Sequence, residues 1–301
     1  MNRSLPHRLV LALLLAGAVP LLAPAAGAAT PAAPDAGLHW HEELEPALAA
    51  AARSGRYVLV DLYAEWCGWC HKLDAEVFGT EPFARFARDY VLLRVDVEDG
   101  AGGSWLQERL GATTLPTLAV VDADLVRVGT VRGFYPTPQF IERVRSAVAG
   151  YETVLERDEK RLAAADPADL ARLAEELRAR QDGRRAARAY RRLLEQAGVS
   201  APRRALYQLH LADALRLARD WQGAERALGA ARATVAKLAA GDRRPLQDQA
   251  DLVVVRLAHD RGGCTAVASL ESFLREHPES RHRRLARGNL AQLRTTSPDC
   301  S

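Results

Sequence analysis

The sequence of 301 residues is poor in several features, and each shortage excludes a class of protein. Its four cysteines are too few for a small domain held together mainly by disulfides. Its formal net charge of +3 gives no electrostatic support for binding nucleic acid. After an apolar run over residues 9–22 no second run reaches membrane length, so we expect no transmembrane segment in the mature chain. A hydrophobic content of 48% and a charged content of 26% exclude a disordered chain.

Residues 1–28 are typical of a secretory signal peptide. Arg3 and Arg8 precede the apolar run, and small residues at 26–28 end it with an A-x-A-like cleavage site. No cysteine lies near that site, which argues against a lipoprotein anchor. Residues 29–37 have the composition of a flexible linker. We therefore expect a secreted protein, exported to the bacterial periplasm.

Residues 38–150 alternate between strand and helix patterns, which predicts an α/β domain with a mixed sheet. We expect strands over 57–63, 91–97, 117–121 and 126–131. We expect helices over 42–53, 67–78, 79–88 and 137–149, and a further helix that follows the glycine-rich loop over 100–103 and ends near Gly111. The order of these elements is βαβ followed by ββα.

Residues 151–301 show no strand pattern and predict an all-α domain. Ala186, Ala224 and Ala266 begin similar segments at spacings of 38 and 42 residues, which resemble degenerate tetratricopeptide repeats of period about 34. A plain helical bundle is the alternative. The formal charge of this part is +7, against −6 for residues 29–150, and we expect the helical part to bind a partner.

A pair of cysteines stands where a predicted buried strand gives way to a helix. Cys67 and Cys70 are separated by Gly68 and Trp69. A thiolate at a helix N-terminus is stabilised by unpaired backbone N–H groups and by the helix dipole. We expect Cys67 to be exposed and to attack disulfides, and Cys70 to point inward and to resolve the mixed disulfide.

Several motifs resemble the thioredoxin superfamily. They are the run VDLYAEWCGWC over 60–70, the loop TLPT over 114–117, and Gly133. Phe78, the run EPF over 81–83, the strand over 91–97 and Gly133-Phe134 are similar to the C-terminal thioredoxin-like domain of the membrane thiol-disulfide interchange protein DsbD. The resemblance covers residues 38–150 and implies a thioredoxin fold with thiol-disulfide oxidoreductase activity.

The resemblance also assigns roles by position. Asp61 is implied to be a buried carboxylate with a raised pKa that accepts a proton from Cys70. Pro116 is implied to be a cis-proline facing the disulfide. The residues implied to contact substrate are Trp66, Trp69, Thr114 and Leu115.

Two features leave alternatives open around the cysteine pair. Gly-Trp separates the cysteines where thioredoxins have Gly-Pro, so the direction of electron flow stays open. His71 is either a modulator of the thiolates or a partly exposed helix residue. It also completes the haem-attachment pattern C-x-x-C-H, but the buried strand and the downstream loop leave no room for a porphyrin. No second Cys/His pair supports zinc, and we expect no metal and no cofactor.

Cys264 and Cys300 lie in the helical part. In an oxidising compartment they are expected to form a structural disulfide. Two free thiols, or a second redox pair exchanging with Cys67, are the alternatives.

The sequence therefore predicts a periplasmic thiol-disulfide oxidoreductase that acts on protein thiols and disulfides. Resemblance to DsbD implies a reductase that draws electrons from a membrane donor of the DsbD type. The alternative function is a helical-repeat adaptor that carries a redox-sensing thioredoxin fold.

Overall fold

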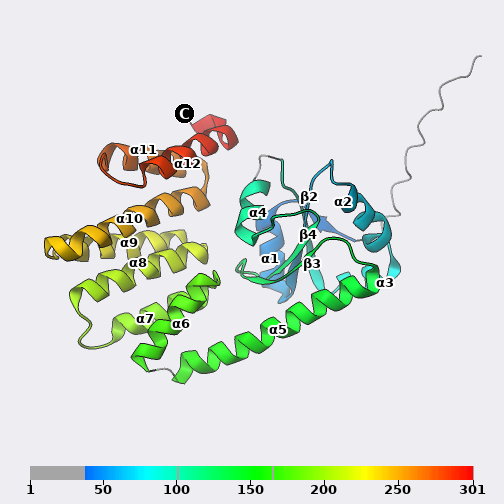
Figure 1. Ribbon diagram of the computed structural model, residues 1–301, viewed down its shortest axis with the longest axis horizontal. Coiled ribbons are helices and arrows are strands. Elements are labelled where there is room, and N and C mark those ends of the chain that lie inside the picture. The colour runs from blue at the N-terminus through cyan, green and yellow to red at the C-terminus, as the bar shows by residue number, and fades with distance from the viewer. Residues whose placement is uncertain (1–37, 100–101, 165, 301) are drawn as a thin grey trace, which may run out of the picture. The chain divides into compact units, whose positions relative to one another are not determined.

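The computed structural model describes residues 38–99, 102–164 and 166–300 (Figure 1). The predicted signal peptide and linker lie outside the described residues. An α/β part comes first and an all-helical part follows, as the sequence predicted. Among the described residues no helix is long and apolar enough to cross a membrane.

The α/β part is built on a five-stranded mixed sheet of order β1-β3-β2-β4-β5. Strands β1, β3 and β2 run parallel, and β4 runs antiparallel to both β2 and β5. The elements are β1 (Trp40–His41), α1 (Leu44–Ser54), β2 (Tyr57–Tyr63), α2 (Gly68–Leu73), the π-helical turn η1 (Asp74–Phe78), α3 (Glu81–Ala87), β3 (Tyr90–Asp96), α4 (Gly103–Leu110), β4 (Thr117–Val121), β5 (Arg127–Arg132) and α5 (Thr137–Ala164).

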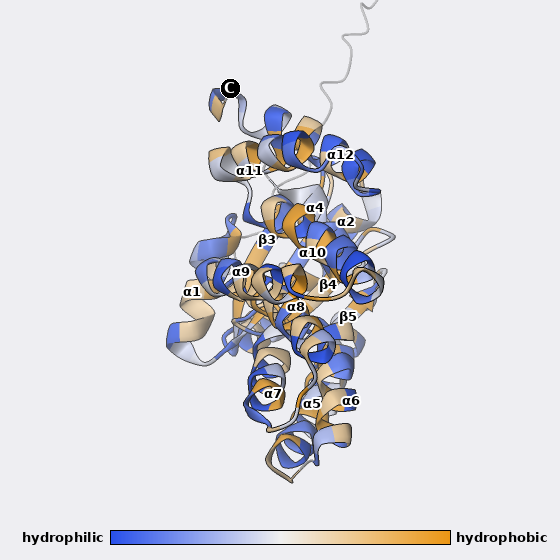
Figure 2. Ribbon diagram, turned by 90° about the vertical axis from the view of Figure 1, so that its left-hand side faces the viewer, coloured by the Kyte–Doolittle hydropathy of each residue, from blue (hydrophilic) through white to orange (hydrophobic). Residues whose placement is uncertain are grey.

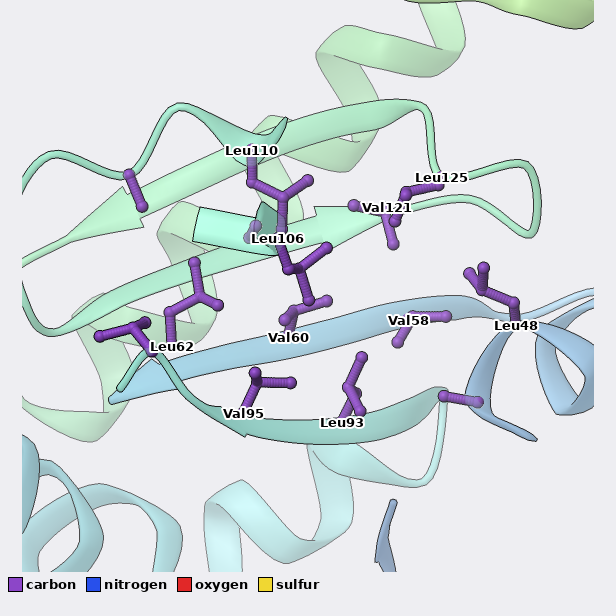
Figure 3. Packing of buried hydrophobic residues seen from close by; sticks show 14 of the residues in the cluster. Leu48, Val58, Val60, Leu62, Leu93, Val95, Leu106, Leu110, Val121 and Leu125 are labelled. Atoms are coloured by element: carbon purple, nitrogen blue, oxygen red, sulfur yellow. The ribbon is translucent and has the colours of Figure 1, made fainter. Parts of the chain in front are cut away.

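Hydrophobic clusters lie on both faces of this sheet. Val58, Val60 and Leu62 of β2 belong to one cluster together with residues of α1 and α4 (Figure 3). Leu59 belongs to the other, with side chains of α3 and α5. Because successive strand residues point to opposite faces, a strand covered on both sides needs apolar residues on both faces, and β2 has them on either side of Asp61. This central strand leads directly into the loop that carries Cys67.

Two helices differ from the prediction. The expected helix over 67–78 changes after Leu73 into the turn η1, where the Gly79 N–H donates to the Asp74 carbonyl at 2.9 Å, five residues back. The expected helix over 137–149 continues through Gly150 to Ala164. A glycine inside a helix costs only about 1 kcal/mol relative to alanine, and burial of Leu162 on the next turns favours continuation. The proposed domain boundary at residue 150 falls inside α5.

The helical part consists of hairpins in which each helix packs on the next. Its elements are α6 (Pro167–Ala179), α7 (Gly183–Glu195), α8 (Ala201–Leu217), α9 (Trp221–Ala236), α10 (Ala240–Arg261), α11 (Gly263–Glu276), α12 (Arg283–Thr296) and the 3₁₀ turn η2 (Pro298–Cys300). Apolar side chains of these helices are buried in shared cores, and hydrophobic and hydrophilic residues are interspersed along them (Figure 2).

Two hairpin turns share the same local design. Asp182 caps α7 by accepting the Arg185 N–H, and Asp220 caps α9 by accepting the Gly223 N–H. The residue before each cap has a positive φ, 65° at Gln181 and 62° at Arg219. A repeated turn supports a repeat origin, and the assignment to tetratricopeptide repeats stays a prediction.

Candidate active site

The cysteine pair lies at the junction of β2 and α2. Cys67 is the N-cap residue of α2, with φ −79° and ψ 92°, and its Sγ accepts the Cys70 N–H at 3.2 Å. The Cys70 N–H also donates to the Cys67 carbonyl at 2.9 Å, so the sulfur and the carbonyl of Cys67 share this N–H at the start of the helix. The structure joins Cys67 and Cys70 in a disulfide whose Cα atoms are 5.2 Å apart.

Both cysteines are buried in this disulfide form. Cys67 is 3% exposed and Cys70 is 2% exposed, so the prediction of an exposed Cys67 is wrong for the oxidised state. The reason is packing: both side chains belong to the apolar cluster shared with α1 and α4, and Leu115 packs against that cluster. Trp66 and Trp69, which directly precede Cys67 and Cys70 in the sequence, are 68% and 58% exposed.

These two tryptophans are tethered although they are exposed. The Trp66 indole N–H donates to Glu98 Oε1 at 2.9 Å. The Trp69 ring lies 6.0 Å from the Phe134 ring, and Lys72 Nζ lies over both rings, at 5.3 Å and 4.8 Å. Exposed rings held in place lose little entropy on contact with another protein. The arrangement supports the prediction that Trp66 and Trp69 contact substrate.

Asp61 of β2 is the buried carboxylate beside this junction, and it is 1% exposed. Its pKa is raised to about 7, mainly by burial; the charge of Arg94 lowers it, and the charge of Asp74 raises it by a smaller amount. Arg94 Nε is 3.5 Å from Asp61 Oδ2, whereas Arg94 Nη2 donates to Asp74 Oδ2 at 2.7 Å. Within the described residues Asp61 Oδ1 has no hydrogen-bond partner. A carboxyl group of this kind can take up or release a proton near neutral pH.

Arg94 and Asp74 are charged neighbours of Asp61 that the sequence analysis missed. Arg94 is a charged residue inside the apolar run of β3, and it lies directly across from Asp61 in the parallel pairing. Asp74 comes four residues after Cys70, one helical turn on. The sequence did contain a signal for Arg94: a charged residue inside a buried strand needs a partner of opposite charge.

The loop over 114–117 is held by backbone contacts at two points. The Leu115–Pro116 peptide bond is cis, as predicted. The Thr117 hydroxyl donates to the Thr114 carbonyl at 2.6 Å, and the Gly133 N–H donates to the Pro116 carbonyl at 2.9 Å. Thr114 is exposed, which leaves it accessible to a protein partner.

His71 contacts the backbone of the loop that precedes the cysteines. Its Nε2 lies 2.8 Å from the Glu65 carbonyl, which ties the ring to the loop before the cysteines. Both sulfurs that a thioether linkage would use are bonded to each other. The described residues contain no group of three or more His, Cys, Asp or Glu that could hold a metal ion. A modulating role of His71 stays a prediction.

Residues 39–123 match a family model described as thioredoxin-like. The chain carries a thioredoxin-like domain. The structure has the mixed sheet, the disulfide after β2 and the cis-proline before β4 that the resemblance implied. The predicted thioredoxin fold is therefore confirmed.

Over this domain the chain is similar to several named proteins. The thiol:disulfide interchange protein DsbD of Cronobacter sakazakii is 35% identical over 102 residues, which are 33% of this chain and 17% of the relative. The chloroplastic thioredoxin-like protein HCF164 of Arabidopsis thaliana is 28% identical over 106 residues, 35% of this chain and 39% of the relative. A solved C-terminal domain of Neisseria meningitidis DsbD in the oxidised form is 22% identical, with a TM-score of 0.33 over 36% of this chain and 99% of that one.

The chain spans less than a fifth of the length of the DsbD relative. The similarity therefore concerns the domain alone. The helical part lies outside the matched residues.

Proposed function

We propose that this chain exchanges disulfides with protein partners through Cys67 and Cys70. The observation that carries the proposal is a disulfide at the N-terminus of α2, preceded on β2 by a buried carboxyl group with a pKa of about 7. An N-terminal helix position favours the thiolate of Cys67, and the carboxyl group offers a proton acceptor.

In the direction of reduction, exchange proceeds in two displacements. The Cys67 thiolate attacks a substrate disulfide, a Cys67–substrate disulfide forms, and one substrate sulfur leaves as a thiolate. Cys70 then transfers its proton to Asp61 and attacks the Cys67 sulfur. The Cys67–Cys70 disulfide forms, and the second substrate sulfur leaves. Two electrons pass from the protein dithiol to the substrate.

Access to Cys67 in the disulfide form requires local movement, because the residue is 3% exposed. Trp66 and Trp69 directly precede the two cysteines in the sequence, and their rings are exposed. We propose that these rings bind the partner protein before the sulfurs react. Thr114 and Leu115 are proposed to pair with an extended segment of the substrate.

We further propose the physiological setting. The pattern of residues 1–28 supports secretion to the periplasm, and similarity to DsbD supports a reductase fed by a membrane donor of the DsbD type. The positive helical part is proposed to bind a partner, in the manner of tetratricopeptide repeats.

Reduction of insulin by the full chain tests the activity. We expect Cys67→Ala and Cys70→Ala to reduce insulin at the uncatalysed rate. Ser146→Ala, at an exposed position of α5, is the matched control and should keep the full rate. Equal rates for wild type and both cysteine variants would leave only the adaptor function, with a redox-sensing thioredoxin fold.

The direction of electron flow follows from the equilibrium of the Cys67–Cys70 pair with glutathione. A potential near about −270 mV would place the pair with reductants, as proposed, and one near about −120 mV with oxidants. The measurement uses the double variant Cys264→Ser with Cys300→Ser, so that the Cys67–Cys70 pair is the one whose redox equilibrium is observed.

A further inference from the structure

A second disulfide, between Cys264 and Cys300, lies in the helical part of the molecule. Its cysteines differ from the active-site pair in exposure: Cys264 is exposed and Cys300 is half-buried, whereas Cys67 and Cys70 are both buried. An accessible disulfide can be approached by a protein thiolate without prior opening of a core.

Cys264 lies at a helix N-terminus, as Cys67 does. It is the second residue of α11, a helix of 14 residues. The N-cap residue is Gly262, which has no side chain to accept the first N–H groups. A Cys264 thiolate would be stabilised by those groups and by the helix dipole. In disulfide exchange the sulfur with the lower thiol pKa leaves faster, so Cys264 is the favoured leaving group.

The bond ties the short turn η2 to α11, beside α12 (Figure 1). The core under these helices consists of other side chains, and Cys300 only packs at its edge. The fully enclosed members of that core are Val255, Ala266, Leu270 and Ala286. Opening the disulfide therefore frees η2 while the core that holds α10, α11 and α12 together stays packed.

We propose that Cys264–Cys300 is a second redox site, reduced by a thioredoxin-type dithiol, including the Cys67/Cys70 pair of another copy of this chain. A donor Cys67 thiolate attacks the Cys300 sulfur, the Cys300–Cys264 bond breaks, and Cys264 leaves as a thiolate. The donor Cys70 thiolate then attacks Cys67, and Cys300 leaves. The products are an oxidised donor and a Cys264/Cys300 dithiol, with protons taken from solvent. This inference rests on the proposed function of Cys67 and Cys70.

Two full-length variants separate donor from acceptor. The donor is Cys264→Ser with Cys300→Ser, reduced and freed of reductant. The acceptor is Cys67→Ala with Cys70→Ala, in its disulfide form. After mixing, the thiols are alkylated and the modified peptides are identified by mass spectrometry. We expect the donor to reduce the Cys264–Cys300 disulfide at least about 100-fold faster than glutathione does at equal thiol concentration, as measured by the alkylated fraction of both cysteines. The helical circular dichroism of the acceptor should stay unchanged.

A trapping variant tests the order of the displacements. A donor with Cys70→Ala in addition should stop at a disulfide between Cys67 and the acceptor Cys300, with Cys264 free for alkylation. A link to Cys264 instead would overturn the assignment of the leaving group.

Insulin distinguishes the two possible failures. If the donor reduces insulin but not the acceptor, the second redox site is disproved and the proposed function stands. If the acceptor is reduced only as its helical signal is lost, the bond is a structural link, and the inference fails as well. An unrelated reduced thioredoxin serves as a second donor, so the acceptor is tested even if this chain fails on insulin.

Discussion

Each of the two parts of this molecule buries an aspartate, and the two carboxyl groups behave in opposite ways. Asp61 in the α/β part is 1% exposed and has a pKa raised to about 7. Asp213 in the helical part is 4% exposed, yet its pKa lies below the usual value. Similar burial thus gives one carboxyl group that can be protonated at neutral pH and one that stays charged.

The difference lies in the cations that each carboxylate meets. Burial alone would raise the pKa of Asp213, but the charges of Arg216 and Arg178 outweigh it. The Arg216 Nε–H donates to Asp213 at 2.9 Å and the Arg178 Nη1–H at 3.2 Å. Asp61 has only Arg94, at 3.5 Å, and the closer contact of that guanidinium is with Asp74. Asp213 is paired with two guanidinium groups, whereas Asp61, the proposed proton acceptor of Cys70, is only partly paired.

Removing the paired carboxylate should destabilise the fold. Asp213→Ala leaves the positive charges of Arg178 and Arg216 without their shared partner, and we expect a loss of about 3 kcal/mol in the free energy of unfolding. Urea unfolding at pH 7 measures it, with Glu279→Ala, in an exposed turn, as the control. Equal midpoints for the two variants would show that the network around Asp213 contributes little.

Removing the unpaired carboxylate should stabilise the fold. The pKa of Asp61 is about 7 in the folded state against an ordinary value of 3.8, so the folded protein binds the proton more tightly. Its contribution to stability then falls as the pH rises from about 4 to about 7. Asp61→Asn should raise the free energy of unfolding by about 2–4 kcal/mol at pH 8 and have little effect at pH 4.

The matching control is Asp89→Asn, at an exposed position, which should show neither change. For Asp213 the sign is reversed, because its lowered pKa gives stability above about pH 4 that is lost on acidification. A uniform effect of Asp61→Asn at all pH values would contradict the ionisation argument.

The same Asp61→Asn substitution should slow catalysis. Without the carboxyl group Cys70 loses its internal proton acceptor, and we expect resolution of the mixed disulfide to slow by about 10-fold to 100-fold at pH 7. Rapid quenching with acid shows the accumulated mixed disulfide. An unchanged rate of resolution would show that water deprotonates Cys70.

Smaller shifts should follow from the neighbours of Asp61. Asp74→Asn removes a negative charge that raises the pKa of Asp61, and Asp61 then no longer shares Arg94 with a second carboxylate. The pKa of Asp61 should therefore fall by about one unit. Arg94→Gln should raise it by a similar amount. The pH dependence of the resolution rate between pH 5 and pH 9 measures both, and shifts in the same direction would refute the shared role of Arg94.

The positions of β2 and β4 were predictable because both are short runs of mostly apolar, β-favouring residues between turns. Both agree with the expected bounds, 57–63 and 117–121. The end of the helix beginning at 137 was not predictable, because Gly150 is a weak local stop signal that burial of Leu162 outweighs. Asp61 could be placed by resemblance, but its partners could not, because Arg94 and Asp74 meet it only through strand pairing and a helical turn.

The sequence by itself determined the thioredoxin-like domain, the cysteine pair at the start of a helix, and the helical character of the part that follows. These features depend on local patterns: apolar runs, short spacings and a few motifs. Only the tertiary structure decided that Cys67 is buried with Cys70, that Arg94 is shared between two carboxylates, and that Cys264 meets Cys300. Exposure, pKa and pairing depend on which distant side chains are brought together, and long-range packing controls that contact.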